Sequence, residues 1–419
     1  MKAGLNTRDL IDPPAQKEAD ELLSGADFSA FGNEIRQSVI AKAYEAHPEQ
    51  MALPPKNVLC LSGGGSFGAF SAGYLNGWTA TGTRPTFDVV TGISTGALIA
   101  PLAFLGPQYD AEVKRFYTEL TTKDVYIKQF VRVLVSESLA DNAPLVKEVD
   151  RVLTPKIMCE IAQAHREGRR LYIGTTELEG KRFVVWDIGA IAIKGGEENR
   201  ELIKQILVGS SAIPGFFPPS KIRVTVDGKK YYEKHGDGGT SQAIFFRPPY
   251  LSEAERTNRD GLHLAGTRIW CIVAGKLYAD PDPLRARALT VAGTSVSSII
   301  YAQTRGDLQR IFTVSLLSGM DYNIAAMDEE FAAPKSATAF EIEPLLSMYN
   351  EGYREATSEK PWRKSPPGNR MNEGVLERGG TDLILSPRGG TTPILNNNPY
   401  FTPAPGPMPI PVLPGTVVK

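Results

Sequence analysis

The chain has 419 residues, 42% hydrophobic and 22% charged, which is typical of a globular protein with one large domain or two medium ones. Its formal net charge of −1 lacks the basic surplus of general nucleic-acid binders, so we expect no nucleic acid partner. The three cysteines and four histidines are scattered without metal-ligand spacing, so we expect neither a metal site nor a cofactor.

Residues 1–54 form a polar extension, in which the segment 29–46 has the pattern of a helix. The first residues lack the apolar region of a signal peptide. The uncharged stretch Val89–Tyr109 is interrupted by glycines and by Pro101, so we predict a strand and a buried helix rather than a membrane span. These features favour a cytoplasmic or peripherally membrane-associated protein.

From Val58 onward, apolar strands alternate with glycine turns and helices. Two such units, 58–78 and 87–106, follow one another, and this alternation indicates a mostly parallel α/β sheet. Further strands are expected within 170–178, 182–189 and 267–275. A hairpin is expected over 224–239 with Asp227-Gly228 at its turn, and helices over 285–355.

The composition changes near residue 361. Twelve of the 31 prolines lie in the last 59 residues, a density that is incompatible with helices and central strands. We therefore expect one domain over 55–360 and an extended or disordered tail over 361–419, which is a candidate ligand for a protein partner.

The first candidate motif is a glycine loop that follows the first predicted strand. Gly63, Gly65 and Gly68 satisfy the pattern GxGxxG, and Asp88 lies twenty residues after the last of them. This is the spacing of a dinucleotide site, in which the acid binds a ribose hydroxyl, so a nucleotide-dependent oxidoreductase is one alternative.

The second motif is "GISTG", Gly92–Gly96, between an apolar strand and an apolar helix. A nucleophile elbow needs this context, because a serine at a sharp strand-to-helix turn requires small residues two positions before and after it. Ser94 is therefore a candidate nucleophile, and the alternative is a serine that caps the helix.

The third motif is "HGDGGT", His235–Thr240. A serine nucleophile needs a base within hydrogen-bonding reach, and the candidates here are Asp237 directly or His235. An Asp-Gly-Gly sequence taken alone is usually a turn.

Together the three motifs favour acyl transfer. Ser94 would attack a carbonyl, Asp237 would accept its proton, and the backbone N–H groups of the glycine loop would stabilise the oxyanion. Hydride transfer has no use for the "GISTG" elbow.

The sequence resembles the patatin-like phospholipases in four motifs and in their order along the chain. These motifs are the glycine loop, the elbow, "SSAIPGFFPP" and "DGGTSQAIF". The resemblance covers Pro55–Trp362. It implies a three-layer α/β/α sandwich and hydrolysis of fatty acyl esters in phospholipids, galactolipids or neutral lipids, at a membrane or micelle surface. It also implies a Ser94–Asp237 dyad in which His235 has no required role. The glycines to which it gives a part are Gly63, Gly64 and Gly65 in the oxyanion hole, and Gly92, Gly96, Gly238 and Gly239 as supports.

One position departs from the family. Many members carry a basic residue where this chain has Phe67, so we expect a preference for less charged acyl esters. The segment Phe216–Pro219 either lines an acyl pocket or merely ends a helix. A catalytically silent binding protein with the same fold, which uses the proline-rich tail as a partner ligand, is a further alternative.

Overall fold

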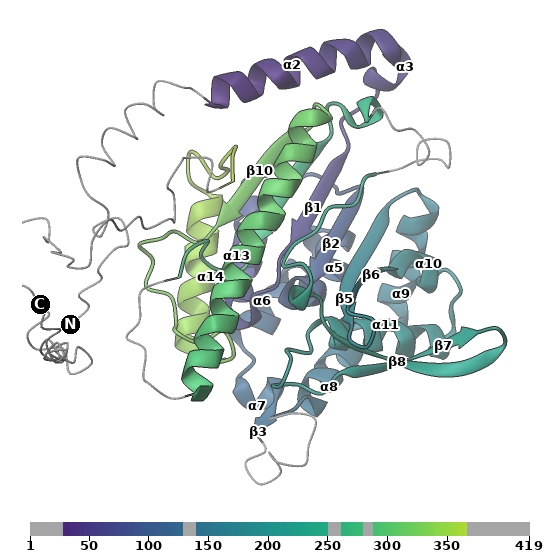
Figure 1. Cartoon of the computed structure of the whole chain (residues 1–419), viewed down its shortest axis with the longest axis vertical. Helices are drawn as coiled ribbons and strands as arrows, with labels where there is room; N and C mark the ends of the chain where they lie inside the picture. The colour runs from purple at the N-terminus through teal and green to yellow at the C-terminus, as the bar shows by residue number, and fades with distance from the viewer. Residues whose placement is uncertain (1–27, 129–139, 250–260, 280–287, 367–419) are drawn as a thin grey trace, which may run out of the picture.

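The computed structural model describes residues 28–128, 140–249, 261–279 and 288–366. Its centre is an eight-stranded sheet, in which five parallel strands continue into an antiparallel edge (Figure 1). The strand order is β10 (Asp321–Ala326), β9 (Arg268–Val273), β1 (Asn57–Leu61), β2 (Val89–Ile93), β5 (Arg170–Glu177), β8 (Lys229–Asp237) and β7 (Ser220–Val226), with β6 (Arg182–Asp187) also paired to β5. A separate two-stranded ribbon joins β3 (Ile127–Lys128) and β4 (Ala140–Asp141).

Helices cover both faces of the sheet. Alternate strand residues such as Val58 and Cys271 pack against Leu308 and Ile311 of α13 (Ala288–Leu317), and α2 (Phe28–Ala46) contacts α13 in turn. The opposite face packs against α4 (Gly68–Ala80), α5 (Thr95–Leu105), α6 (Asp110–Thr118), α8 (Ala143–Val152), α9 (Pro155–Arg166), α11 (Gly196–Ser210) and α14 (Ile342–Ala356). Shorter helices are α3 (Pro48–Met51), α7 (Thr122–Val125) and α10 (Ile188–Ala192). The predicted three-layer fold class is confirmed.

Most of the predicted elements are present. The expected strands correspond to β5, β6 and β9, and the segment 29–46 lies in α2. The β7–β8 hairpin turns at Asp227 and Gly228, whose φ angles of 51° and 76° are those of the tight turn that these residue types favour.

The prediction of helices throughout 285–355 was wrong at β10. Gly319, with a φ of 67°, lies just after the end of α13, and Asp321–Ala326 then pairs in parallel with β9. All residues from Tyr322 to Ala326 are buried. A short apolar run with both faces buried has no alternation, so its periodicity cannot distinguish a strand from a helix.

Two helices that start near opposite ends of the domain sequence pack unusually closely. A Cβ atom at Gly73 or Gly77 of α4 would overlap the backbone of α14, and one at Gly352 of α14 would overlap the Phe70 carbonyl of α4. These glycines let the two backbones touch, and α4 is thereby fixed along its length.

The packing of the domain extends past α14. Trp362 contacts Trp78 and Trp270 with ring centroids 4.7 Å and 4.8 Å apart, and Arg363 pairs with Ile324 of β10. The part of the proline-rich tail from 367 to 419 lies outside the described residues, so the structure says nothing of its predicted disorder.

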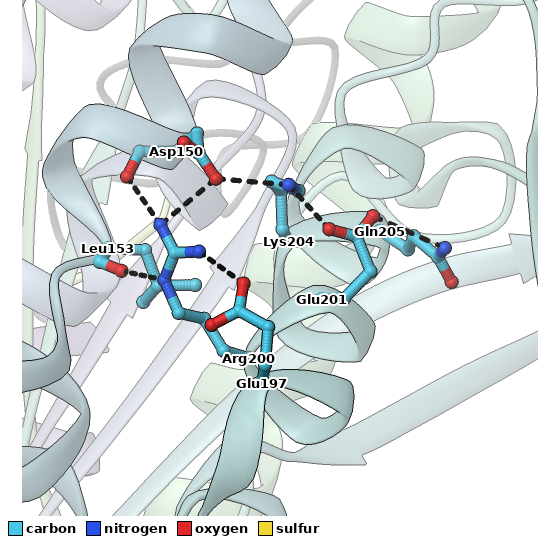
Figure 2. Close-up of polar contacts among 7 residues, drawn as sticks. All are labelled: Asp150, Leu153, Glu197, Arg200, Glu201, Lys204 and Gln205. Atoms are coloured by element: carbon cyan, nitrogen blue, oxygen red, sulfur yellow. Dashed lines mark hydrogen bonds and ion pairs between the residues drawn. The ribbon is translucent and has the colours of Figure 1, made fainter.

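A polar clamp joins α8 to α11 (Figure 2). The Arg200 guanidinium donates to the Leu153 carbonyl at 2.6 Å and to Asp150 Oδ1 at 2.9 Å, and Lys204 Nζ lies 3.0 Å from the same oxygen. Apolar side chains of α5, α6, α8, α9 and α11, the last of these helices and α8 being those that the clamp joins, line a cavity of about 20 Å³. The clamp thus holds one wall of this cavity.

Candidate active site

Ser94 lies at the sharp turn between β2 and α5. Its φ of 52° and ψ of −123° are in a region that non-glycine residues rarely occupy, and such strain is concentrated at functional sites. Its side chain makes no capping hydrogen bond to α5, which argues against the helix-cap alternative. A Cβ atom at Gly92 would overlap the Gly96 carbonyl, and one at Gly96 would overlap the Leu61 carbonyl, so both flanking positions must be glycine.

Asp237 is the last residue of β8 and is brought against Ser94 from 143 positions away. Ser94 Oγ donates to Asp237 Oδ2 at 2.6 Å, and the Gly239 N–H donates to Oδ1 at 2.7 Å. Burial raises the pKa of Asp237 to about 6, although the hydrogen bonds from Ser94 and Gly239 act in the opposite direction. A carboxylate with this pKa is mostly ionised at neutral pH and can still accept a proton.

The glycine loop follows β1 and lies beside Ser94. A Cβ atom placed on Gly63 would be 3.1 Å from the Ser94 Cβ. The Gly63 N–H donates to the Ala243 carbonyl at 3.0 Å and is therefore occupied. Within the described part of the chain, the N–H groups of Gly64 and Gly65 donate to no protein acceptor.

The geometry of the loop explains the glycines that supply these donors. Gly65 has a φ of 57°, and a Cβ atom there would overlap the Ala337 carbonyl. A Cβ atom at Gly64 would overlap the Ala274 carbonyl. Side chains at either position would displace the backbone from its neighbours.

Two serines that the sequence analysis gave no role fix the elbow from α11. The Ser94 N–H donates to Ser210 Oγ at 3.0 Å, and Ser211 Oγ donates to the Ser94 carbonyl at 3.1 Å. Ser210 Oγ in turn donates to the Gly174 carbonyl of β5 at 2.6 Å. Both serines lie in the segment "SSAIPGFFPP", but nothing in its pattern indicates contact with Ser94.

Asp307 of α13 supports the loop from the other side of the sheet. Its buried carboxylate accepts the Ala243 N–H at 2.7 Å, and the carbonyl of the same Ala243 accepts the Gly63 N–H. Burial raises the pKa of the Asp307 carboxyl. Through Ala243, α13 thus fixes the position of the glycine loop.

His235 is fully buried but is not in contact with Ser94. Its Nδ1 lies 2.9 Å from Thr175 Oγ1 and its Nε2 lies 3.1 Å from Glu233 Oε2. Both ring nitrogens are therefore engaged elsewhere, and the geometry favours Asp237 over His235 as the base.

Asp88 contradicts the dinucleotide alternative. It precedes β2, whereas Gly63 follows β1, and these two strands are parallel neighbours. The two residues thus lie at opposite ends of these strands, about 16 Å apart for strands of this length. The Asp88 carboxylate instead accepts the Asn57 N–H at 2.8 Å and lies 3.3 Å from Lys56 Nζ.

Apolar residues adjoin Ser94 and Asp237. The Asp237 N–H donates to the Ala212 carbonyl, and the chain continues from Ala212 to Phe216 and Phe217, which pack edge-on against Tyr126. The rings form a small apolar cluster beside the site rather than only the end of a helix.

None of the described helices is long and apolar enough to cross a membrane. Over the same residues, no group of three or more His, Cys, Asp or Glu side chains is arranged to hold a metal ion.

The match to a family model agrees with the motifs. Residues 59–250 match the family described as patatin-like phospholipase. Among solved structures, VipD from Legionella pneumophila is similar, with 11% identity and a TM-score of 0.36 over 73% of this chain and 66% of that one. Human GIVD cytosolic phospholipase A2, solved with methyl gamma-linolenyl fluorophosphonate, has 11% identity and a TM-score of 0.28 over 79% of this chain and 62% of that one. The chain thus covers just under two thirds of each structure. Comparison with curated proteins found no match.

Proposed function

We propose that this chain, whose residues 59–250 match the patatin-like phospholipase family, hydrolyses fatty acyl esters of lipids with Ser94 as nucleophile and Asp237 as base. The observation that carries the proposal is the 2.6 Å hydrogen bond from Ser94 Oγ to a buried carboxylate, at a strained turn beside two N–H groups that have no acceptor among the described residues. A phospholipase A-type cleavage, which releases a fatty acid and a lysolipid, is the form that we propose.

In the acylation step, Ser94 Oγ attacks the ester carbonyl carbon while its proton passes to Asp237. The negative charge that develops on the carbonyl oxygen is stabilised by the N–H groups of Gly64 and Gly65, with Gly63 holding the loop against Ala243. Removing one such donor commonly costs roughly 3–4 kcal/mol of transition-state stabilisation. Collapse of the intermediate breaks the ester bond, and the leaving alcohol takes the proton from Asp237.

In the deacylation step, water attacks the acyl carbon on Ser94 and gives its proton to Asp237. The second collapse releases the fatty acid and returns the proton to Ser94 Oγ, so that the enzyme is unchanged. The apolar side chains around Phe216 and Phe217 are the surface that we propose for the acyl chain.

A fluorophosphonate probe tests the proposal. We expect one adduct per chain by intact mass, because Ser94 Oγ displaces fluoride from phosphorus, and no adduct on Ser94→Ala. The same proteins are assayed on phosphatidylcholine vesicles and on a neutral glyceride. Folded wild type that neither takes up the probe nor releases fatty acid would support the silent binding protein instead.

The pH dependence follows from the raised pKa of Asp237. The base must be ionised to accept a proton, so kcat/KM should fall about tenfold per pH unit below about pH 6 and level off above about pH 7. The rate of hydrolysis of a water-soluble short-chain ester, measured from roughly pH 4.5 to pH 8, covers the range in which this carboxyl group is expected to titrate.

Glu355 supplies the control for this assignment. Burial also raises its pKa, to about 7, but it lies in the last turn of α14, where it accepts the Asp328 N–H at 3.0 Å. The Glu355→Gln variant should keep the same limb. If the Glu355→Gln variant lost the fall in kcat/KM at low pH, the titration would belong to Glu355 rather than Asp237, and the prediction would be wrong.

A further inference from the structure

The β7–β8 hairpin is a ribbon with two different faces. It joins the sheet through only three residue pairs with β5, among them Thr175 and Asp237, and the rest of it extends beyond them (Figure 1). Side chains alternate along each strand, so residues paired across the ribbon share a face. One face holds Ile222 and His235, which are buried, and this face packs against α11.

The other face of the ribbon is basic. Its members come from both strands and include no acidic residue: Lys221, Arg223, Thr225, Lys230, Tyr232 and Lys234. All are exposed except Lys234, which is half-buried, and Tyr232 is 65% exposed. We refer to these six residues as the basic face.

The charge on this hairpin is concentrated. Residues 220–235 contain five basic and two acidic side chains, a net charge of +3, whereas the whole chain has −1. Lys221 lies directly opposite Lys234, an arrangement of like charges that destabilises a ribbon.

The basic face is also poorly neutralised by the protein itself. Arg223 pairs with Glu198 of α11. Over the residues that the structure describes, Lys221 and Lys230 have no ion-pair partner. Uncompensated lysines beside an exposed tyrosine are therefore available to an external anion.

We propose that the basic face binds the anionic surface of a lipid bilayer. Lysine ammonium groups are attracted by acidic headgroups, and a tyrosine ring is suited to the boundary between headgroups and acyl chains. The face is an exposed ribbon surface rather than a pocket, which fits an extended surface better than a single small anion. The inference rests on the proposed function, because β8 carries this face at one end and Asp237 at the other.

Vesicle sedimentation tests the inference, with every variant made in a Ser94→Ala background so that the lipid stays intact. We expect binding to phosphatidylcholine vesicles that contain phosphatidylserine, little binding without it, and weaker binding as salt is added. The double variant Lys221→Gln/Lys230→Gln should bind ~30-fold more weakly, since each lysine near an anionic surface contributes about 1 kcal/mol. Tyr232→Ser should also weaken binding.

The matched control is Lys42→Gln/Lys360→Gln, which removes the same charge from exposed positions on other elements. It should bind like the parent protein. The inference is overturned if the parent binds no anionic vesicles, if both double variants lose affinity equally, or if the hairpin variant retains full affinity.

A second readout separates this inference from the proposed function. With Ser94 restored, the hairpin variant should hydrolyse a water-soluble ester and take up the fluorophosphonate probe at the parent rate, while hydrolysis of anionic vesicles falls. If the parent protein hydrolysed no ester but its vesicle binding still depended on Lys221 and Lys230, the proposed hydrolase function would be rejected and the proposed membrane-binding face would be retained.

Discussion

Asp237→Asn is expected to lower kcat for ester hydrolysis by about 10⁴-fold, close to the upper range for loss of a general base. The asparagine oxygen can still accept the Gly239 N–H, while its NH2 group faces Ser94 Oγ and donates to it, so the elbow should keep its geometry. An amide cannot take up a proton, however, and Ser94 would have to attack without a base. KM should change little.

The assay is the initial rate with a short-chain ester, together with the rate of fluorophosphonate labelling and the melting temperature. Asp88→Asn is the matched control, because Asp88 lies at the opposite end of the strands, where it accepts a hydrogen bond from Asn57 and forms an ion pair with Lys56. It should retain kcat within about twofold, as expected for a change remote from the chemistry. An Asp237→Asn protein that kept the parent kcat would remove Asp237 from the mechanism.

Gly64→Ala is expected to lower kcat by about 10²-fold to 10³-fold, the usual effect of losing one oxyanion donor. The added Cβ atom would overlap the Ala274 carbonyl, and that neighbour is backbone that follows β9 and cannot move aside cheaply. The loop must shift instead, and the N–H groups of Gly64 and Gly65 move away from the substrate oxygen. Ser94 and Asp237 remain paired.

Gly306→Ala is the control for this variant. Gly306 lies within α13, and a Cβ atom there would meet no atom within 4 Å, so alanine should leave kcat unchanged and stabilise the helix by about 1 kcal/mol. The comparison uses kcat, KM and thermal unfolding of the three proteins. Parent-like turnover by a folded Gly64→Ala protein would show that the loop supplies no essential donor.

The local elements of this protein could be predicted from its sequence. Continuous apolar runs indicated β1, β2 and β9, because strands buried on both faces carry few polar residues. Asp227-Gly228 indicated the hairpin, because these residues tolerate positive φ. The strand β10 was not predicted, because a short apolar run between helical segments has no periodicity that distinguishes a strand from a helix.

The arrangement of the candidate site was decided by tertiary structure. The motifs containing Ser94 and Asp237 were visible in the sequence, but the choice of Asp237 over His235 depends on which side chain reaches the elbow, and both ring nitrogens of His235 bond elsewhere. The sequence spacing of Asp88 fits a nucleotide site, and only the direction of two parallel strands separates it from the glycine loop.

The contacts that support the site could not be predicted from the pattern of the sequence. Ser210 holds the elbow across 116 positions, and Asp307 reaches the glycine loop only through Ala243. The basic face of the hairpin likewise depends on strand register, which places lysines of two strands on one side. Local sequence determined the turns, strands and helices because their propensities act over a few residues. Contacts between distant segments depend on how the sheet and its helices pack, and that is known only once the whole chain has folded.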